Sequence, residues 1–295
     1  MKLCRFGEQR LGLVEGSKVR DVTAALDALP SYRYPLPRYD VMIANLGAIA
    51  ARVREIAARS PALPLEGLKL LSPVANPGKI VAAPVNYRRH LDEVKDNPEL
   101  HAGNPAHTAS IQSIGLFLKA TSSLTGSGEG ITLRHLERRN DHEVELALVI
   151  GKEARSVPAR QALEYVAGYS IGLDITIRGA EDRSFRKSPD SYTVLGPWLV
   201  TPDEIPSPGA LDLSLSVNGE TRQSSNTSQM ILGVAELIEF ASSFYTLYPG
   251  DVMITGTPEG VSPIYPGDTI VARIEHIGEM EVKVGQASAR PTAVA

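Results

Sequence analysis

The stretch NDHEVELALVIG, Asn140–Gly151, decides how the rest of the chain is interpreted. Its second half is a short apolar run that ends at a glycine, which is typical of a buried strand. Glu143 and Glu145 come just before that run, and their spacing of two points both side chains to one face of a strand. Ala147 and Val149 continue the same face. Two carboxylates therefore share a wall with residues that we expect to be buried.

Like charges on such a wall repel each other strongly where the dielectric is low, and a bound cation would remove the conflict. An exposed strand end would remove it too, so this stretch alone leaves both interpretations open. Asp174, between Leu173 and Ile175 in GYSIGLDITIR, adds a third carboxylate to an apolar strand pattern. Three carboxylates without a thiolate or a histidine pair suit Mg²⁺ or Mn²⁺, with Ca²⁺ as an alternative. The sequence does not show whether the three converge.

Composition excludes several classes of protein. The chain has 295 residues, 43% of them hydrophobic and 22% charged, with a net charge of −4, which disfavours a nucleic-acid surface as its main feature. No apolar run approaches the roughly 20 residues that cross a bilayer, and the first residues contain no secretory signal pattern. The single cysteine, Cys4, allows no internal disulfide and fits a cytoplasmic location.

The pattern of short strands predicts the domain organisation. We expect a small strand-and-helix domain over residues 1–70, a main domain over 71–286 and a loose tail over 287–295. Helical spacing is clear only at 41–60, 158–168 and 231–244, while most other segments are short and strand-like. The chain is therefore predicted to be a β-rich mixed α+β protein.

Two further groups of polar residues are candidates for chemistry. His90 and Glu93 are three residues apart, so a helix would place them on one face, where a carboxylate can orient an imidazole that acts as a base. An ordinary surface pair is the alternative. Arg178 and Lys187 could hold negative charge that develops near a metal, or they could be solvated side chains.

Taken together, these segments resemble the fumarylacetoacetate hydrolase family. The resemblance extends from Lys79 to about Gly285 and rests on six ordered motifs: KIVAAPVNYRRHLDE, LFLKATSSL, HEVELALVIG, AGYSIGLDITIR, KSPDSYTVLGPWLV and PGDVMITGTPEGV. Six motifs in order are far more specific than any one of them. The chain departs from the family pattern at Pro84, where glycine is usual, and at Gly179 and Glu181, where Asp and Gln are common.

The resemblance implies a β-roll-like core with a small N-terminal α+β domain, usually in a homodimer. It also implies roles for nine residues. The metal ligands would be Glu143, Glu145 and Asp174; the catalytic residues His90, Glu93 and Lys187; and the substrate-binding residues Arg178, Lys119 and Thr257.

The function that the resemblance implies is metal-dependent hydrolysis of a C–C bond in a 2-oxo or β-diketo acid of the acylpyruvate or fumarylpyruvate type, in aromatic-compound catabolism. Its partner would be a small 2-oxo acid, with neither nucleic acid nor membrane involved. The same enolate chemistry supports a 2-hydroxyhepta-2,4-diene-1,7-dioate isomerase, a 5-oxopent-3-ene-1,2,5-tricarboxylate decarboxylase or an oxaloacetate decarboxylase. A binding protein without turnover remains a third alternative.

Overall fold

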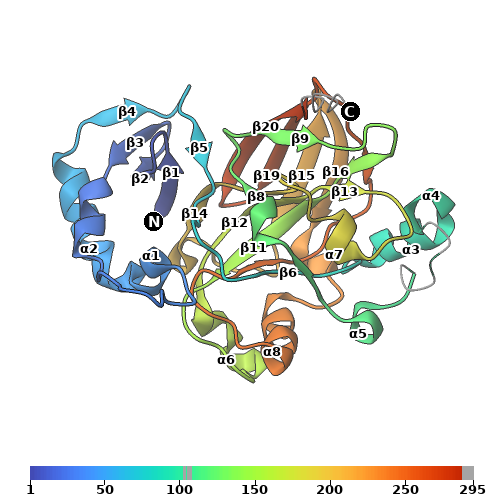
Figure 1. The fold of residues 1–295 in the computed structure, drawn as a ribbon, viewed down its shortest axis with the longest axis horizontal. Helices are drawn as coiled ribbons and strands as arrows, with labels where there is room; N and C mark the ends of the chain where they lie inside the picture. The colour runs from blue at the N-terminus through green and yellow to red at the C-terminus, as the bar shows by residue number, and fades with distance from the viewer. Residues whose placement is uncertain (102–103, 105–107, 288–295) are drawn as a thin grey trace, which may run out of the picture.

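The computed structural model describes residues 1–101, 104 and 108–287. Its largest sheet is shown in Figure 1 and contains β1 (Lys2–Phe6), β2 (Arg10–Glu15), β3 (Lys18–Asp21), β4 (Ala62–Pro64), β5 (Leu70–Leu71), β6 (Ile80–Ala82), β7 (Phe117–Lys119), β8 (Leu124–Thr125), β11 (Val144–Ile150), β12 (Val166–Asp174), β14 (Thr193–Val200) and β17 (Val252–Ile254). Its order is β4-β3-β2-β1-β14-β12-β11-β17-β6-β7, with β5 beside β1 and β8 beside β14. β11 and β12 therefore lie in its interior.

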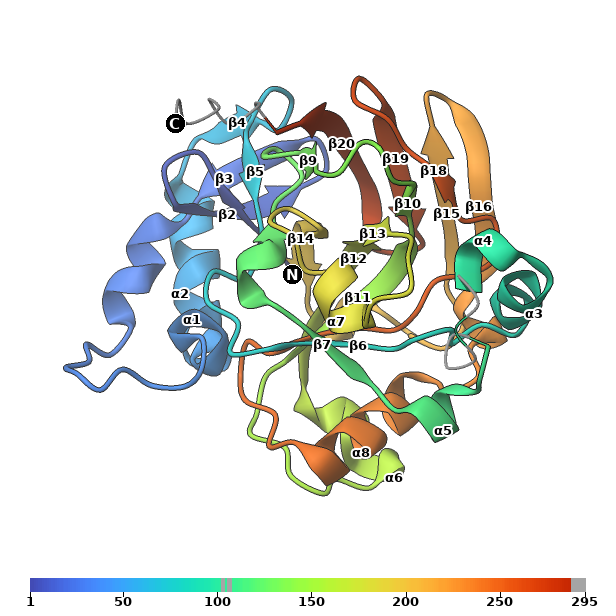
Figure 2. The same ribbon diagram turned by 45° about the vertical axis from the view of Figure 1, so that its right-hand side comes forward.

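Two smaller sheets complete the β structure of the described residues. The order β13-β10-β18 joins β10 (Asn140–His142), β13 (Thr176–Ile177) and β18 (Ser262–Pro263). The order β16-β15-β19-β20-β9 joins β9 (Ile131–Leu133), β15 (Asp212–Val217), β16 (Glu220–Asn226), β19 (Thr269–Ile274) and β20 (Gly278–Gln286). This second sheet stands against the large one, since β11 contacts β15 and β12 contacts β19 (Figure 2).

The helices are short and lie around the sheets. They are α1 (Val41–Ala44), α2 (Leu46–Arg59), α3 (Arg88–Asp96), α4 (Pro98–His101), α5 (Ile111–Ile114), α6 (Ala159–Ala162), α7 (Arg183–Arg186) and α8 (Val234–Phe244). α1 and α2 lie with the N-terminal strands, and α6 packs against α8 (Figure 1). Within the described part of the chain, none of these helices has the length and apolarity needed to span a membrane.

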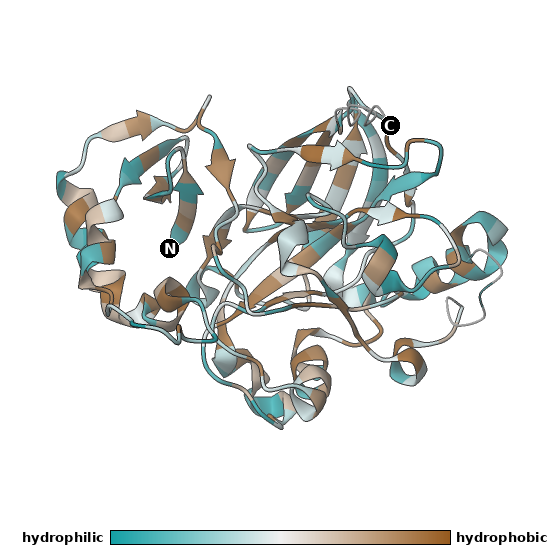
Figure 3. Cartoon of the chain, viewed as in Figure 1, coloured by the Kyte–Doolittle hydropathy of each residue, from teal (hydrophilic) through white to brown (hydrophobic). Residues whose placement is uncertain are grey.

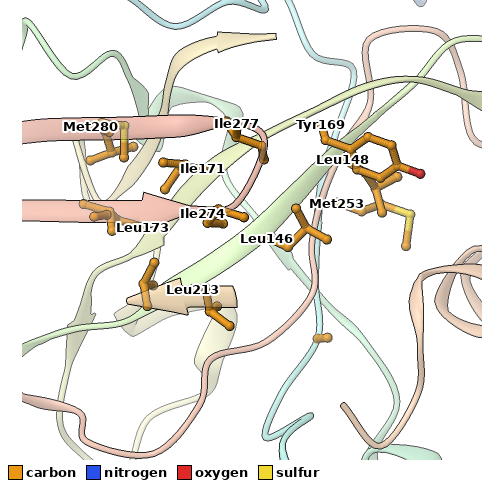
Figure 4. Close-up of a cluster of buried hydrophobic side chains, with 14 of the residues drawn as sticks. Leu146, Leu148, Tyr169, Ile171, Leu173, Leu213, Met253, Ile274, Ile277 and Met280 are labelled. Carbon is orange, nitrogen blue, oxygen red and sulfur yellow. The ribbon is translucent and has the colours of Figure 1, made fainter. Parts of the chain in front are cut away.

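The strand β11 is buried on both faces, which explains its unbroken apolar run. Leu146 and Leu148 belong to a core cluster with residues of β12, β15 and β19, drawn in Figure 4. Ala147 and Val149 belong to a second cluster, which includes Ile49 of α2. Figure 3 shows the same contrast at larger scale, with hydrophobic colour recurring along the central strands and hydrophilic colour prominent on α3 and α4.

The predicted β-rich mixed fold is confirmed, but one predicted helix is wrong in extent. The helical pattern over 158–168 gives only α6 and a 3-10 turn that ends at Tyr165, and β12 begins at Val166. Val166 pairs with Ile150, and Gly168 pairs with Val149, so ladder hydrogen bonds to β11 overrule the local helical preference. The helix predicted over 41–60 is divided at Asn45 into α1 and α2.

The predicted division at residue 70 stays a prediction. The N-terminal strands form part of the largest sheet because β1 pairs with β14, where Leu3 lies opposite Leu199. Leu3 also shares its apolar cluster with Ile49 and Val53 of α2. Of the predicted tail, residues 288–295 lie outside the described residues.

Candidate active site

Strand register brings the three acidic residues together. Val144 pairs with Leu173, and the backbone amide of Asp174 donates to the carbonyl of Glu143 at 2.9 Å. Glu143, Glu145 and Asp174 are 4%, 1% and 1% exposed, and each can offer one carboxylate oxygen within 4.8 Å of the others. The convergence that the sequence left open is therefore present.

Two lysines neutralise part of this acidic cluster. The Lys187 ammonium donates to Glu143 Oε2 at 2.6 Å and to Asp174 Oδ2 at 2.7 Å. Lys119 donates to Asp174 Oδ1 and, at 2.8 Å, to the carbonyl of Tyr192. Burial lowers the pKa of Lys119, and the negative charge of Asp174 opposes that effect. Both lysines thus reach the acids through hydrogen bonds as well as charge.

The backbone at Gly256 approaches the third acid closely. Its amide donates to Glu145 Oε2 at 2.5 Å. Gly256 has a φ of +93°, and a Cβ there would lie 2.6 Å from the Cβ of Asn86. Glycine is therefore required by both conformation and space, and it fixes one donor toward Glu145.

The pKa values within the cluster move apart. Burial would raise the pKa of Glu143, but Lys187 and Arg178 outweigh it and hold the pKa well below its usual range. Burial, together with the Asp174 carboxylate, raises the pKa of Glu145 well above its usual range. Because its carboxylate neighbours repel its ionised form, a divalent cation would favour the charged form that binds metal. An oxygen-only donor set of three buried carboxylates fits Mg²⁺ or Mn²⁺.

Arg178 supports the cluster from outside. Its guanidinium donates to Glu143 Oε1 at 2.9 Å and to Asp141 Oδ2 at 2.7 Å. Asp141 is fully buried and also accepts from Arg139 at 2.8 Å. A substrate-binding role for Arg178 stays a prediction, since in this structure its described ion pairs are with protein carboxylates.

The histidine and glutamate of α3 form a hydrogen-bonded pair. His90 Nδ1 lies 2.8 Å from Glu93 Oε2, and the backbone amide of Gly260 donates to Glu93 Oε1 at 3.0 Å. His90 is buried, and its proximity to Glu143 contributes to the lowered pKa of the Glu143 carboxyl. The helix therefore places the pair on one face, as the spacing indicated, and leaves the ring oriented by a carboxylate.

Thr257 has a hydroxyl that is engaged twice by the protein. It donates to the carbonyl of Val144 at 2.9 Å and accepts from Gln223 Nε2 at 2.8 Å. The other end of that amide, Gln223 Oε1, accepts from the Val144 amide at 3.0 Å and lies 3.1 Å from His142 Nδ1. Thr257 therefore holds the start of β11, and its predicted contact with substrate stays a prediction.

These groups meet at a small cavity of about 30 Å³, which has room for water. Its polar lining consists of two of the three acidic residues, the candidate base, one hydroxyl and four cationic side chains: Glu143, Glu145, His90, Thr257, Lys187, Arg178, Arg183 and Arg186. Its apolar lining comes from the segment before α3 and from α3 and α4: Ala83, Pro84, Val85, Val94 and Leu100. Lys119 lies outside this lining and reaches the site through Asp174.

Comparison with known proteins decides the family. The family described as fumarylacetoacetate (FAA) hydrolase C-terminal matches residues 79–285. The chain belongs to the fumarylacetoacetate hydrolase family. The resemblance carried by the six motifs is thereby confirmed.

Several members of the fumarylacetoacetate hydrolase family are similar over most of the chain. A maleylpyruvate hydrolase of Aquipseudomonas alcaligenes is 62% identical over 284 residues, covering 96% of this chain and 99% of that protein. The crystal structure of a maleylpyruvate hydrolase from Sphingobium sp. SYK-6 in complex with manganese (II) ion and pyruvate is 37% identical, with a TM-score of 0.82, over 98% of this chain and all of that one. An oxaloacetate tautomerase, mitochondrial, of Rattus norvegicus is 36% identical over 84% of this chain and 80% of its own length.

Sequence reasoning missed four residues of this family site. Asp141 precedes Glu143 and Glu145 at the same spacing of two, so the pattern D-x-E-x-E could have revealed it. Arg183 and Arg186 stand three residues apart beside Lys187, a spacing that could have marked them as one face of a helix. The fourth residue, Gln223, has no comparable signal in the sequence around it.

Proposed function

We propose that this protein is a divalent-metal-dependent hydrolase that cleaves a C–C bond of an acylpyruvate, with maleylpyruvate as the leading substrate, in the catabolism of an aromatic compound. The observation that carries the proposal is the convergence of three buried carboxylates, two of which, Glu143 and Glu145, line a cavity together with His90 and Lys187. The relative with 62% identity, a maleylpyruvate hydrolase, supports the same chemistry.

Glu143, Glu145 and Asp174 would hold Mg²⁺ or Mn²⁺. When bound there, such an ion supplies Lewis-acid stabilisation to the carboxylate and 2-oxo oxygens of the substrate. Lys187 lies beside two of these ligands, with its ammonium 2.6 Å from Glu143 and 2.7 Å from Asp174. Its positive charge would stabilise the enolate oxygen that forms as the C–C bond breaks.

His90 would act as the general base. Because Nδ1 is engaged by Glu93, Nε2 is the nitrogen available to take a proton from water. The hydroxide formed adds to the distal carbonyl of the acylpyruvate. The bond from that carbon to the methylene then breaks, its electron pair forms the enolate, and a proton added at the methylene carbon gives pyruvate. The other product is a carboxylic acid, so one water is consumed for each bond cleaved.

The apolar lining from α3 and α4 would form a cover over the site. A cavity of about 30 Å³ admits water, whereas ligand pockets for small organic acids are typically about 300 Å³ or larger. Substrate entry would therefore require α3 to move outward, and its return would bring His90 and Glu93 back to the substrate. In this proposal α3 acts as a lid that carries His90 and Glu93.

The deciding experiment is pyruvate release from maleylpyruvate by Mn²⁺-loaded protein, with chelator-treated protein as the matched control. We expect stoichiometric pyruvate and maleate only in the loaded sample. The tautomerase relative favours one alternative, isomerisation or decarboxylation of a 2-oxo acid, so oxaloacetate and hydroxylated dienedioates belong in the same panel. Turnover of those compounds alone would replace hydrolysis with that alternative, and inactivity throughout the panel would indicate a binding protein.

We also propose that the protein is a cytoplasmic homodimer. The single cysteine and the family resemblance support these two statements. Light scattering behind size-exclusion chromatography tests the assembly: a mass near twice 31.7 kDa is expected, and a monomer mass would contradict it.

A further inference from the structure

Arg186 is a buried cation that the proposed mechanism does not use. It is the last residue of α7, a helix capped by Asp182, whose side chain accepts from the Ser184 amide at 2.8 Å. It precedes Lys187 and is only 4% exposed. Both Arg186 and Lys187 line the cavity together with Glu143 and Glu145. The charge of Arg186 is therefore held inside the protein next to the reaction site.

The protein leaves this guanidinium poorly satisfied. A guanidinium has five N–H donors. Within the described residues Arg186 Nε is buried without a hydrogen-bond partner, and Nη1 makes a long bond of 3.4 Å to the carbonyl of Ile177. Buried charges in proteins are normally paired, so an unpaired one at a cavity indicates an anionic ligand.

Arg186 also remains charged under ordinary conditions. Burial is the main cause, and the positive charge of Arg178 the second, that lowers the pKa of Arg186 to about 10, so Arg186 is a cation at neutral pH. Two of the other cations at this cavity are committed to protein carboxylates: Arg178 to Asp141 and Glu143, and Lys187 to Glu143 and Asp174. The ion pairs of the described residues include none for Arg186 with a protein carboxylate. Its charge is therefore available to a second anionic group of the substrate.

We propose that Arg186 binds the distal carboxylate of a dianionic substrate, the end that does not face Glu143, Glu145 and Asp174. This inference rests on the proposed function and adds to it the residue that would recognise the second carboxylate of a substrate such as maleylpyruvate. The planar fork of an arginine matches a carboxylate with two parallel hydrogen bonds, which a lysine cannot reproduce. Arg186 is accordingly a specificity residue, and hydrolysis itself remains with the residues assigned above.

The test is calorimetric binding of two inert ligands to Mn²⁺-loaded protein. 2-Oxoheptanedioate and 2-oxoheptanoate have the same chain and differ only in a terminal carboxylate or methyl group. We expect the intact protein to bind the dicarboxylate more tightly by roughly tenfold or more, as a charge-assisted pair allows. Arg186→Met should remove that preference and leave the affinity for the monocarboxylate unchanged. Arg186→Lys should keep part of the preference because it keeps the charge.

The matched control is Arg160→Met, which removes an exposed arginine from α6 and should preserve the preference. Unchanged Mn²⁺ affinity in each variant shows that its site has folded. The proposal is overturned if intact protein binds both ligands equally, if Arg186→Met retains the preference, or if that variant weakens both ligands alike.

The same variants separate this proposal from the proposed function. Intact protein that prefers the dicarboxylate but releases no pyruvate from maleylpyruvate would contradict the hydrolase assignment alone. Active protein whose Arg186→Met variant keeps the full preference would contradict the role of Arg186 alone. For hydrolysis, Arg186→Met should mainly raise the KM for the dianionic substrate and leave kcat nearly unchanged, because Arg186 binds the substrate and takes no part in bond cleavage.

Discussion

The acidic cluster and the His90–Glu93 pair meet at one cavity, which Glu143, Glu145 and His90 line, but they are supported in different ways. Glu145 and Asp174 lie on interior strands of the largest sheet, and strand pairing holds their backbone at several points. The pair instead lies on α3, which is tied to the opposite wall by the hydrogen bond from Gly260 to Glu93 and by an exposed ion pair between Arg89 and Glu259. The difference teaches that the proposed metal ligands are positioned by the sheet in the core, whereas the proposed base is positioned by one short helix at the edge of the site.

Removing a carboxylate from the cluster should have the largest effect. In Glu143→Ala, Lys187 keeps Asp174 and Arg178 keeps Asp141 as a partner, so we expect the fold to survive. Metal binding should be lost, and kcat/KM should fall by roughly ten-thousandfold or more, as expected when several kcal/mol of metal stabilisation disappear. Calorimetric titration with Mn²⁺ measures the first effect, and circular dichroism checks the fold. An unchanged Mn²⁺ affinity would refute Glu143 as a ligand.

Removing the base should affect turnover without affecting the metal. His90→Ala is expected to lower kcat by roughly a hundredfold to ten-thousandfold, the usual contribution of a general base. Its Mn²⁺ affinity should equal that of the intact protein, because the cluster is held by strands and not by α3. Parallel titration and pyruvate assays provide the comparison. Undiminished turnover would remove His90 from the mechanism, and a weakened metal site would mean that the two regions are not independent.

Glu93→Gln should have a smaller effect because it retains the shape of the side chain. The amide can still accept from Gly260 but no longer presents a charge to His90. Where a carboxylate orients an imidazole, its loss typically costs roughly tenfold to a hundredfold. Pre-steady-state pyruvate release would locate the loss in the chemical step. A variant as impaired as His90→Ala would instead show that Glu93 is needed to hold α3 in place.

The sequence predicted those parts of the site that depend on local geometry, and it did not predict those that depend on contacts between distant segments. The spacing of Glu143 and Glu145 predicted a shared face, since strand geometry is local, and the six motifs predicted the family. Convergence with Asp174 depends on register between strands about thirty residues apart along the chain, which local patterns do not specify. The helix predicted over 158–168 was wrong in extent for the same reason, because pairing with β11 decides the state of Val166.

Burial of the basic residues was the least predictable feature. A lone arginine is normally solvated, so the sequence favoured the ordinary interpretation for residues such as Arg186. It is buried where α7 packs beside β7 and where its Nη1 reaches the carbonyl of Ile177 in β13, and neither contact has a local signature in the sequence. The motifs contained Lys187, and only the three-dimensional arrangement revealed that its neighbour is buried as well.

Replacing Thr257 should have the smallest effect on catalysis, and it tests whether this hydroxyl supports β11 or contacts the substrate. Thr257→Val removes the hydroxyl that joins Val144 to Gln223 and leaves a buried amide donor with one partner fewer. We expect the free energy of unfolding to fall by about 1–3 kcal/mol, the usual cost of an unsatisfied buried polar group. The change in kcat/KM should stay within roughly tenfold, because the backbone of β11 remains paired with β12 and β17. Thr257→Ser is the matched control and should restore stability. A large rise in KM in the valine variant, with an unchanged free energy of unfolding, would instead identify the hydroxyl as a substrate contact. Loss of a buried structural hydrogen bond is expected to lower the free energy of unfolding.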